Sequence, residues 1–203
     1  MRGRFIVFEG LDGAGTTTQV ARLASWLRSR DVDVETTKEP TTGPIGAVLR
    51  QAIEGRVVLD AATLALAFAA DRTDHLFNPV NGVARSLDAG RWVVSDRYVL
   101  SSLAYQDDGA TARSWLREIN ARALEPDLTI FVDTSVTECR RRLTARSSHA
   151  ELFDDSLDRT KASYDALLDG LTSPLVRIDG DGDVDRVAEA IAAAVERWVG
   201  GTS

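Results

Sequence analysis

A glycine-rich stretch near the start of the chain constrains the fold more than any other feature. An apolar run, Phe5–Phe8, leads through Glu9 into the glycine loop, Gly10-Leu11-Asp12-Gly13-Ala14-Gly15-Thr16-Thr17-Thr18. A short buried strand, a turn with three glycines and the start of a helix are the layout of a loop that binds phosphate. Its backbone N–H groups and the positive end of the helix dipole would face the anion.

One position of the glycine loop departs from the phosphate-loop pattern. Gly10 and Gly15 have the required spacing, and Thr17 fits the position of the Ser or Thr that binds Mg²⁺. The position of the phosphate-binding lysine holds Thr16. Taken alone, the loop fits a nucleotide site with one altered residue and a tight turn without a ligand equally well.

Composition excludes several classes of function. The chain has 203 residues, enough for one domain with a full core, and its formal net charge of −7 gives no general basic surface for nucleic acid. The single cysteine, Cys139, excludes an internal disulfide and fits a reducing compartment. We see no signal peptide and no apolar run of the ~20 residues that a membrane span needs, so a cytoplasmic protein without membrane contact is expected.

Apolar runs alternate with stretches of helical periodicity along the chain. Strands are expected at Arg4–Glu9, Val32–Thr36, Arg91–Ser95, Leu128–Val132 and Pro174–Ile178. Strands that alternate with helices predict an α/β fold, with a parallel sheet, right-handed crossovers and helices on both faces, in a single domain over residues 1–203. Ligands of such sheets bind at the carboxyl ends of the strands.

One predicted helix is apolar nearly all round. It runs from Ala61 to about Leu76, and Asp60 precedes it as a candidate N-cap. A helix of this kind is buried on more than one side. In a domain of this size, we hypothesise that the additional face contacts another subunit.

Charged and polar residues follow the expected third strand. Asp96 and Arg97 are either a surface ion pair or a Mg²⁺ ligand next to an arginine that clamps phosphate. Ser101, Tyr105 and Gln106 follow at about one-turn spacing and are expected to face the same site. In the glycine loop, Asp12 is either a turn former or a carboxylate near the phosphates.

Phe68 and Arg72 lie four residues apart on one face of the predicted apolar helix. An aromatic residue at this spacing usually belongs to a core. A buried guanidinium, however, needs an acceptor. A base stacked on Phe68 with its polar edge at Arg72 would supply that acceptor.

Arginines are concentrated in one predicted helix, Ser135–Arg146. Arg142 and Arg146 are four residues apart and precede a short polar break. They form either a solvated helix face or a lid that closes over a transferred phosphate. Arg50 lies late in a predicted helix and fits a solvated cation that complements the helix dipole. The two histidines, His75 and His149, stand alone, which argues against a zinc site.

Together, these residues resemble the thymidylate kinase family, nucleoside monophosphate kinases of the P-loop class. The matching stretches occur in family order from about Phe5 to the terminal helix. They are Phe8–Gly15, Glu39-Pro40, Leu66–Arg72, Asp96-Arg97-Tyr98 with Ser101, and Ala104-Tyr105-Gln106.

The resemblance implies a fold, a reaction and roles for individual residues. The fold would be the three-layer P-loop NTPase fold, with five parallel strands and a short lid at about 142–156. The reaction would phosphorylate dTMP to dTDP with ATP and Mg²⁺ for dTTP synthesis, commonly in a homodimer. ATP would bind to residues 10–18, and Mg²⁺ to Thr17 and Asp96. The dTMP site would comprise Asp12, Glu39, Pro40, Arg50, Phe68, Arg72, Arg97, Ser101, Tyr105 and Gln106.

The family that the chain resembles includes one type with an arginine in the glycine loop and another type with arginines in the lid. The glycine loop has no arginine, whereas Arg142 and Arg146 precede the expected lid, so the chain resembles the lid-arginine type. With Asp12 and Arg97, these two arginines are the expected catalytic residues. Thr16 departs from the family pattern, and we hypothesise that Arg142 or Arg146 supplies the missing charge. Two alternatives stay open: another nucleotide or nucleoside kinase of this class, and a catalytically silent nucleotide-binding regulator.

Overall fold

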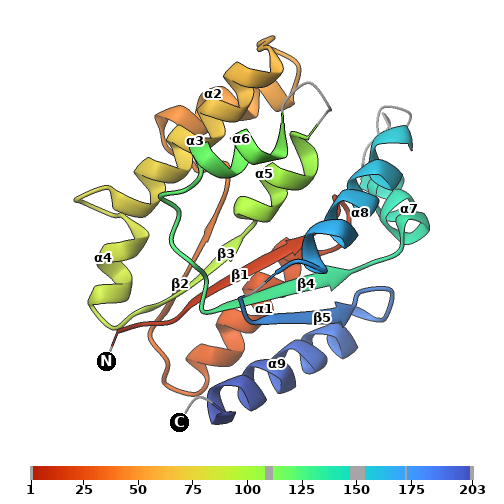
Figure 1. Cartoon of the computed structure of the whole chain (residues 1–203). Helices are drawn as coiled ribbons and strands as arrows, with labels where there is room; N and C mark the ends of the chain where they lie inside the picture. Colours follow the sequence, from red (N-terminus) through yellow and green to blue (C-terminus); the bar gives the residue numbers. More distant parts are fainter. Residues whose placement is uncertain (1, 108–111, 147–153, 172, 202–203) are drawn as a thin grey trace.

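The strand that leads into the glycine loop lies at the centre of a parallel sheet (Figure 1). The computed structural model describes residues 2–107, 112–146, 154–171 and 173–201. Its strands lie in the order β2-β3-β1-β4-β5, and every neighbouring pair is parallel. Their bounds are β1 (Phe5–Gly10), β2 (Val34–Lys38), β3 (Trp92–Asp96), β4 (Leu128–Asp133) and β5 (Leu175–Asp179).

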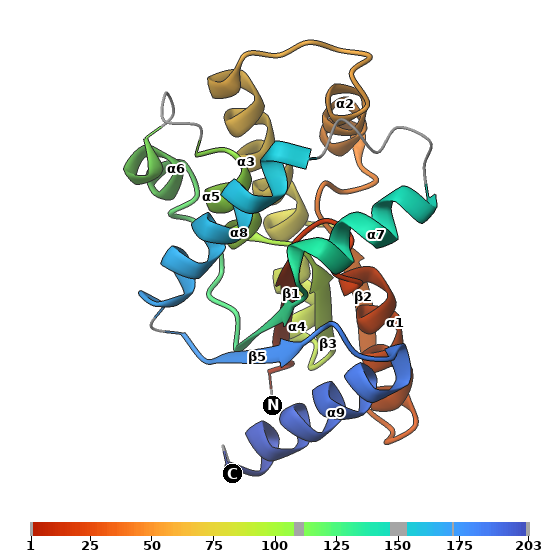
Figure 2. The same ribbon diagram turned by 90° about the vertical axis from the view of Figure 1, so that its right-hand side faces the viewer.

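Helices cover both faces of the sheet, so the architecture has three layers (Figures 1 and 2). One face carries α1 (Thr16–Arg28) and α9 (Val184–Gly201), which contact each other. The helices of the other face and of the carboxyl edge are α2 (Pro44–Ile53), α3 (Ala61–Phe77), α4 (Val83–Asp88), α5 (Val99–Tyr105), α6 (Arg113–Ile119), α7 (Val136–Arg146) and α8 (Asp154–Leu168). The expected five-stranded α/β fold is confirmed.

The central strand β1 is buried on both faces, which explains its continuous apolar sequence. Ile6 and Phe8 belong to the larger hydrophobic cluster, whereas Phe5 and Val7 belong to a separate cluster with α3 and α4. Successive side chains of a strand point to opposite faces, so each face of β1 anchors one cluster. This double burial fixes the position of the glycine loop at the end of β1.

Of the five expected strands, the second differs most from its expected bounds. The second strand begins at Val34 rather than Val32, because the chain is still in the turn that closes α1: Asp31 has φ +59°, and Val32 N–H donates to Leu27 O. The chain between β3 and β4 forms two helices, α5 and α6. The N-cap of α3 is confirmed, since the Asp60 carboxylate accepts a hydrogen bond from Thr63 N–H at 2.9 Å.

No helix in the described ranges is both long enough and apolar enough to span a membrane.

Candidate functional site

The glycine loop has the conformation of an anion cradle. Gly13 and Gly15 have φ values of +85° and +95°, which side-chain-bearing residues rarely adopt. A Cβ on Gly13 would also lie 2.7 Å from the carbonyl oxygen of Cys139. The first N–H groups of α1 have no intrahelical acceptor, so they are available to a phosphate at the loop.

Arg142 supports the glycine loop from outside. Its guanidinium donates to Ala14 O at 3.1 Å and to Gly180 O at 2.9 Å, and its Nε donates to Glu138 at 2.7 Å. Hydrogen bonds from Arg141 and Arg142 lower the pKa of Glu138 to about 2, so that carboxylate is charged. Arg142 is thus held against backbone carbonyls and a carboxylate. The side chain of Arg146 and residues 147–153, which include about half of the expected lid, lie outside the described part.

Thr17 and Asp96 form a pair at the start of α1 and the end of β3. The Thr17 hydroxyl donates to Asp96 Oδ2 at 2.5 Å. The other carboxylate oxygen, Oδ1, is buried and has no hydrogen-bond partner among the described residues. A buried oxygen without a partner is costly. Carboxylate and hydroxyl oxygens are the ligands that Mg²⁺ prefers, so this pair fits such an ion.

Arg97 links the end of β3 to the glycine loop. Its backbone has φ +75°, a strained conformation for a residue with a long side chain. The guanidinium donates to Gly10 O and binds Asp12 Oδ1 at 2.7 Å, while Asp12 N–H donates to the Tyr105 hydroxyl at 2.9 Å. Asp96 and Arg97 therefore do not pair with each other. Each is directed to a different part of the loop.

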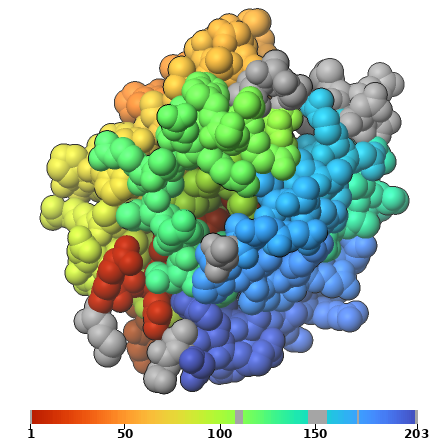
Figure 3. All heavy atoms as spheres, viewed as in Figure 1, coloured from red at the N-terminus to blue at the C-terminus, as the bar shows by residue number. Residues whose placement is uncertain are grey.

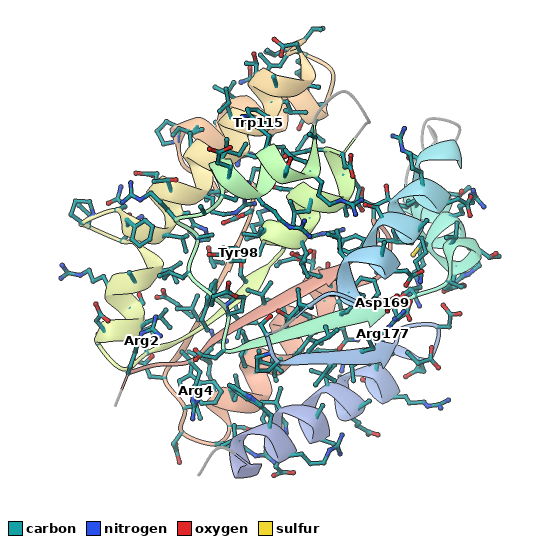
Figure 4. The ribbon with its side chains drawn as sticks, in the orientation of Figure 1. Arg2, Arg4, Tyr98, Trp115, Asp169 and Arg177 are labelled. Atoms are coloured by element: carbon teal, nitrogen blue, oxygen red, sulfur yellow. The ribbon has the colours of Figure 1, made fainter. Side chains whose placement is uncertain are left out.

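Glu9, which was not predicted as a site residue, organises the helices beside the loop. Its fully buried carboxylate accepts from Tyr98 N–H at 3.0 Å, from Ser101 Oγ at 2.6 Å and from the Tyr164 hydroxyl at 3.0 Å. Burial raises the pKa of Glu9 above its ordinary value. Tyr98, labelled in Figure 4, lies between the sheet and α5 and α6.

Glu9 also lies at a cavity of about 290 Å³ that α5, α6 and the segment after α8 enclose. Leu103, Arg117 and Leu171 are among its lining residues. Figure 3 shows the face of the molecule that is hollowed between the green atoms of α5 and α6 and the blue atoms of α8.

Nine of the ten residues predicted for dTMP line one cavity of about 340 Å³, the α3–α5 cavity. The exception is Arg50, which instead donates a hydrogen bond to Thr41 O. Gln106 is 9% exposed, and its buried Oε1 has no partner in the described part of the chain. The nine residues are Asp12, Glu39, Pro40, Phe68, Arg72, Arg97, Ser101, Tyr105 and Gln106.

Protein acceptors satisfy Arg72, so its burial does not require a bound base. The side chain is 3% exposed and pairs with Glu39 at 2.7 Å. It also donates to Asn120 Oδ1, to Tyr98 O at 3.2 Å and to Ser102 Oγ at 3.0 Å. The burial of Arg72 is therefore no argument for a bound base, although Arg72 does line the cavity.

Helix α3 also holds the loop after β2. The Asp71 carboxylate accepts from the backbone and hydroxyl of Thr41, both at 2.7 Å. His75 was expected to stand alone, but its ring lies 3.0 Å from Glu39 and 2.6 Å from Thr37. Sequence reasoning missed Asp71, although it lies between residues of the Phe68–Arg72 motif.

Another cavity, of about 580 Å³, lies on the other side of the glycine loop and is called the α7–α9 cavity. Ala14 and Gly15 line it together with Arg141, Arg142 and residues 180–184. Asp12, only two residues before Ala14, lines the α3–α5 cavity. The glycine loop thus separates two cavities.

The family follows from comparison with known proteins. A family model described as "Thymidylate kinase" matches residues 8–191. The chain belongs to the thymidylate kinase family. "Thymidylate kinase" of Alkalilimnicola ehrlichii is 34% identical to it, covering 99% of this chain and 98% of its own length. "Thymidylate kinase" of Nitrosomonas eutropha is also 34% identical, covering 97% and 94%. "Probable thymidylate kinase" of Pyrococcus abyssi is 36% identical and covers 97% of both chains.

Arg72→Met tests the buried network of this thymidylate kinase family member. The substitution leaves the Glu39 carboxylate buried without its guanidinium, and we expect it to lower the free energy of unfolding by about 3–5 kcal/mol, as measured by urea denaturation. The double variant Arg72→Met/Glu39→Gln removes both charges. Its loss of unfolding free energy should be smaller than the sum of the losses in the two single variants. A loss below about 1 kcal/mol for Arg72→Met would contradict the network.

Glu9→Gln tests the buried carboxyl. Because the pKa of Glu9 is raised in the folded state, its protonated form favours folding and this contribution is lost as the pH rises through the folded pKa. We therefore subtract the unfolding free energy of the parent from that of the variant. As the pH increases beyond 4.5, the ordinary pKa of a glutamate, this difference should increase and then level off. Urea denaturation up to about pH 8 measures it. The exposed Glu189→Gln is the control, and a pH-independent difference for Glu9→Gln refutes the prediction.

Proposed function

We propose that the chain transfers the γ-phosphoryl group of ATP to dTMP and releases dTDP and ADP. The observation that carries this proposal is the α3–α5 cavity, in which nine residues predicted for dTMP converge beside a phosphate-type loop. Family membership supports the same reaction. Its product would serve the synthesis of dTTP.

The α3–α5 cavity offers a stacking surface and a polar edge to a base. In our proposal, thymine stacks on Phe68, while Arg72, fixed by Glu39, presents its cationic surface to a carbonyl edge. The Oε1 atom of Gln106 is an acceptor without a partner among the described residues. A ring N–H of thymine supplies the matching donor, which favours a base that carries such a hydrogen.

Positioning and charge neutralisation would carry the catalysis, because phosphoryl transfer needs no covalent intermediate. We propose that Arg97 binds the dTMP phosphate next to Asp12, and that ATP approaches from the α7–α9 cavity. Thr17 and Asp96 would hold Mg²⁺, which neutralises charge on the ATP phosphates when bound. Arg50 would join the dTMP phosphate only if it releases the Thr41 carbonyl.

We also propose a homodimer in the cytoplasm. Leu66 on α3 is 50% exposed and Val48 on α2 is 46% exposed, so both helices present apolar side chains outside the core. A single catalytic domain over residues 1–203, with a lid at about 142–156, completes this proposal.

An acceptor panel tests the proposed function. ADP release is measured with ATP, Mg²⁺ and dTMP, dUMP, dCMP, dGMP or AMP. We expect the highest kcat/KM with dTMP. Highest turnover on another acceptor would instead favour a related kinase. Binding of ATP and dTMP without turnover would favour a silent regulator.

Phe68→Ala tests the stacking surface. Base stacking on an aromatic side chain contributes about 1–3 kcal/mol, so we expect KM for dTMP to rise about 5- to 150-fold while KM for ATP stays within about twofold. Phe77→Ala is the matched control, because Phe77 lies on the same helix but outside the cavity and is 38% exposed. Equal effects of the two substitutions on dTMP would contradict the proposed role.

A further inference from the structure

The glycine loop lacks its lysine, and the arginines beside it are already engaged. Arg97 binds Gly10 O and Asp12, and Arg142 binds Glu138 and backbone carbonyls on the outside of the loop. Thr16 itself is 5% exposed and carries no charge. Among the side chains that the structure describes, neither of these arginines offers an unengaged cation to the terminal phosphates of ATP.

Lys38 lies where such a cation is needed. It is the last residue of β2 and the register partner of Asp96 on β3. Register partners on neighbouring parallel strands project their side chains from the same face of the sheet. Asp96 projects toward Thr17 at the start of α1. Lys38 therefore belongs to the face that carries the glycine-loop helix.

A further cavity connects these residues. It has a volume of about 530 Å³ and is lined by Thr17, Lys38 and Asp96, and we call it the β2 cavity. The side chain of Lys38 has no ion-pair or hydrogen-bond partner in the described ranges, and the residue is exposed. The chain contains 22 arginines and only two lysines. The other lysine, Lys161, is paired with Asp165 at 2.7 Å and with Asp133 at 3.3 Å.

We propose that Lys38 replaces the missing lysine of the glycine loop and binds the terminal phosphate of ATP from the β2 side. This inference rests on the proposed ATP-dependent function. The ammonium is a compact charge on a flexible four-carbon stem, so it can reach across Asp96 from the neighbouring strand. The phosphate is then held by loop N–H groups on one side and by this cation on the other. Lys38 remains protonated throughout and exchanges no bond with the substrates.

Substitution of Lys38 gives the first test. Loss of a charge-assisted hydrogen bond corresponds to about a ten- to 150-fold change, so Lys38→Gln should lower kcat/KM for ATP by that factor. Lys38→Arg should retain more activity than Lys38→Gln, and the thermal unfolding midpoint should not change. Lys161→Gln is the matched control with activity near the parent value. A Lys38→Gln variant within twofold of the parent would overturn the proposal.

A second position separates a phosphate contact from an indirect effect. Thr16→Lys restores the usual cation of the loop, so Lys38→Gln should cost much less in the Thr16→Lys background than in the parent. Equal losses in the two backgrounds would show that the two positions do not serve the same phosphate, which would also overturn the proposal.

Chemical labelling tests the contact without dTMP turnover. An acyl-phosphate derivative of ATP transfers its acyl group to an amine near the terminal phosphate. Mass spectrometry should find the label on Lys38 and not on Lys161, and excess ATP should prevent it. Label that is absent from Lys38, or that ATP does not suppress, would refute the inference. If Lys38 is labelled but dTMP is not phosphorylated by the parent, the proposed function fails while the ATP contact stands.

Discussion

The buried carboxyl of Glu9 holds together the elements that surround the glycine loop. It comes from the end of β1, yet it accepts hydrogen bonds from backbone N–H groups at the start of α5 and from Tyr164 on α8. The N-terminal residues of α5 provide no side-chain cap of their own, so a residue from the central strand performs that role. Because Glu9 directly precedes the glycine loop, the loop and the wall of the α3–α5 cavity are fixed by the same group.

A second constraint is that acceptors within the protein satisfy the hydrogen-bond donors of Arg72. Four acceptors from the loop after β2, from the segment after α6, from Tyr98 and from α5 hold the guanidinium in one orientation. A buried charge that is fully paired is preorganised, so little side-chain entropy is lost when a ligand binds beside it. The cavity therefore owes its shape to hydrogen bonds that exist before any ligand arrives.

Local patterns were sufficient for the fold, because alternating strands and helices predicted the parallel sheet. The resemblance to the thymidylate kinase family supplied most of the residues that line the α3–α5 cavity. Sequence could not reveal the partners of Arg72, because Glu39 and Asn120 are 33 and 48 residues away. For the same reason it missed Tyr164 next to Glu9, 155 residues apart. The orientation of Arg142 toward carbonyls depended on the loop after β5, which no local pattern connects to α7.

The glycine loop separates the α3–α5 cavity from the α7–α9 cavity. This separation bears on the order in which substrates bind and products leave. Asp12 lines one cavity, whereas Ala14 and Gly15 line the other. Molecules that occupy them would enter by different routes and meet only at their reacting ends. Neither would have to wait for the other to arrive or depart, an arrangement that favours random-order addition and independent product exchange.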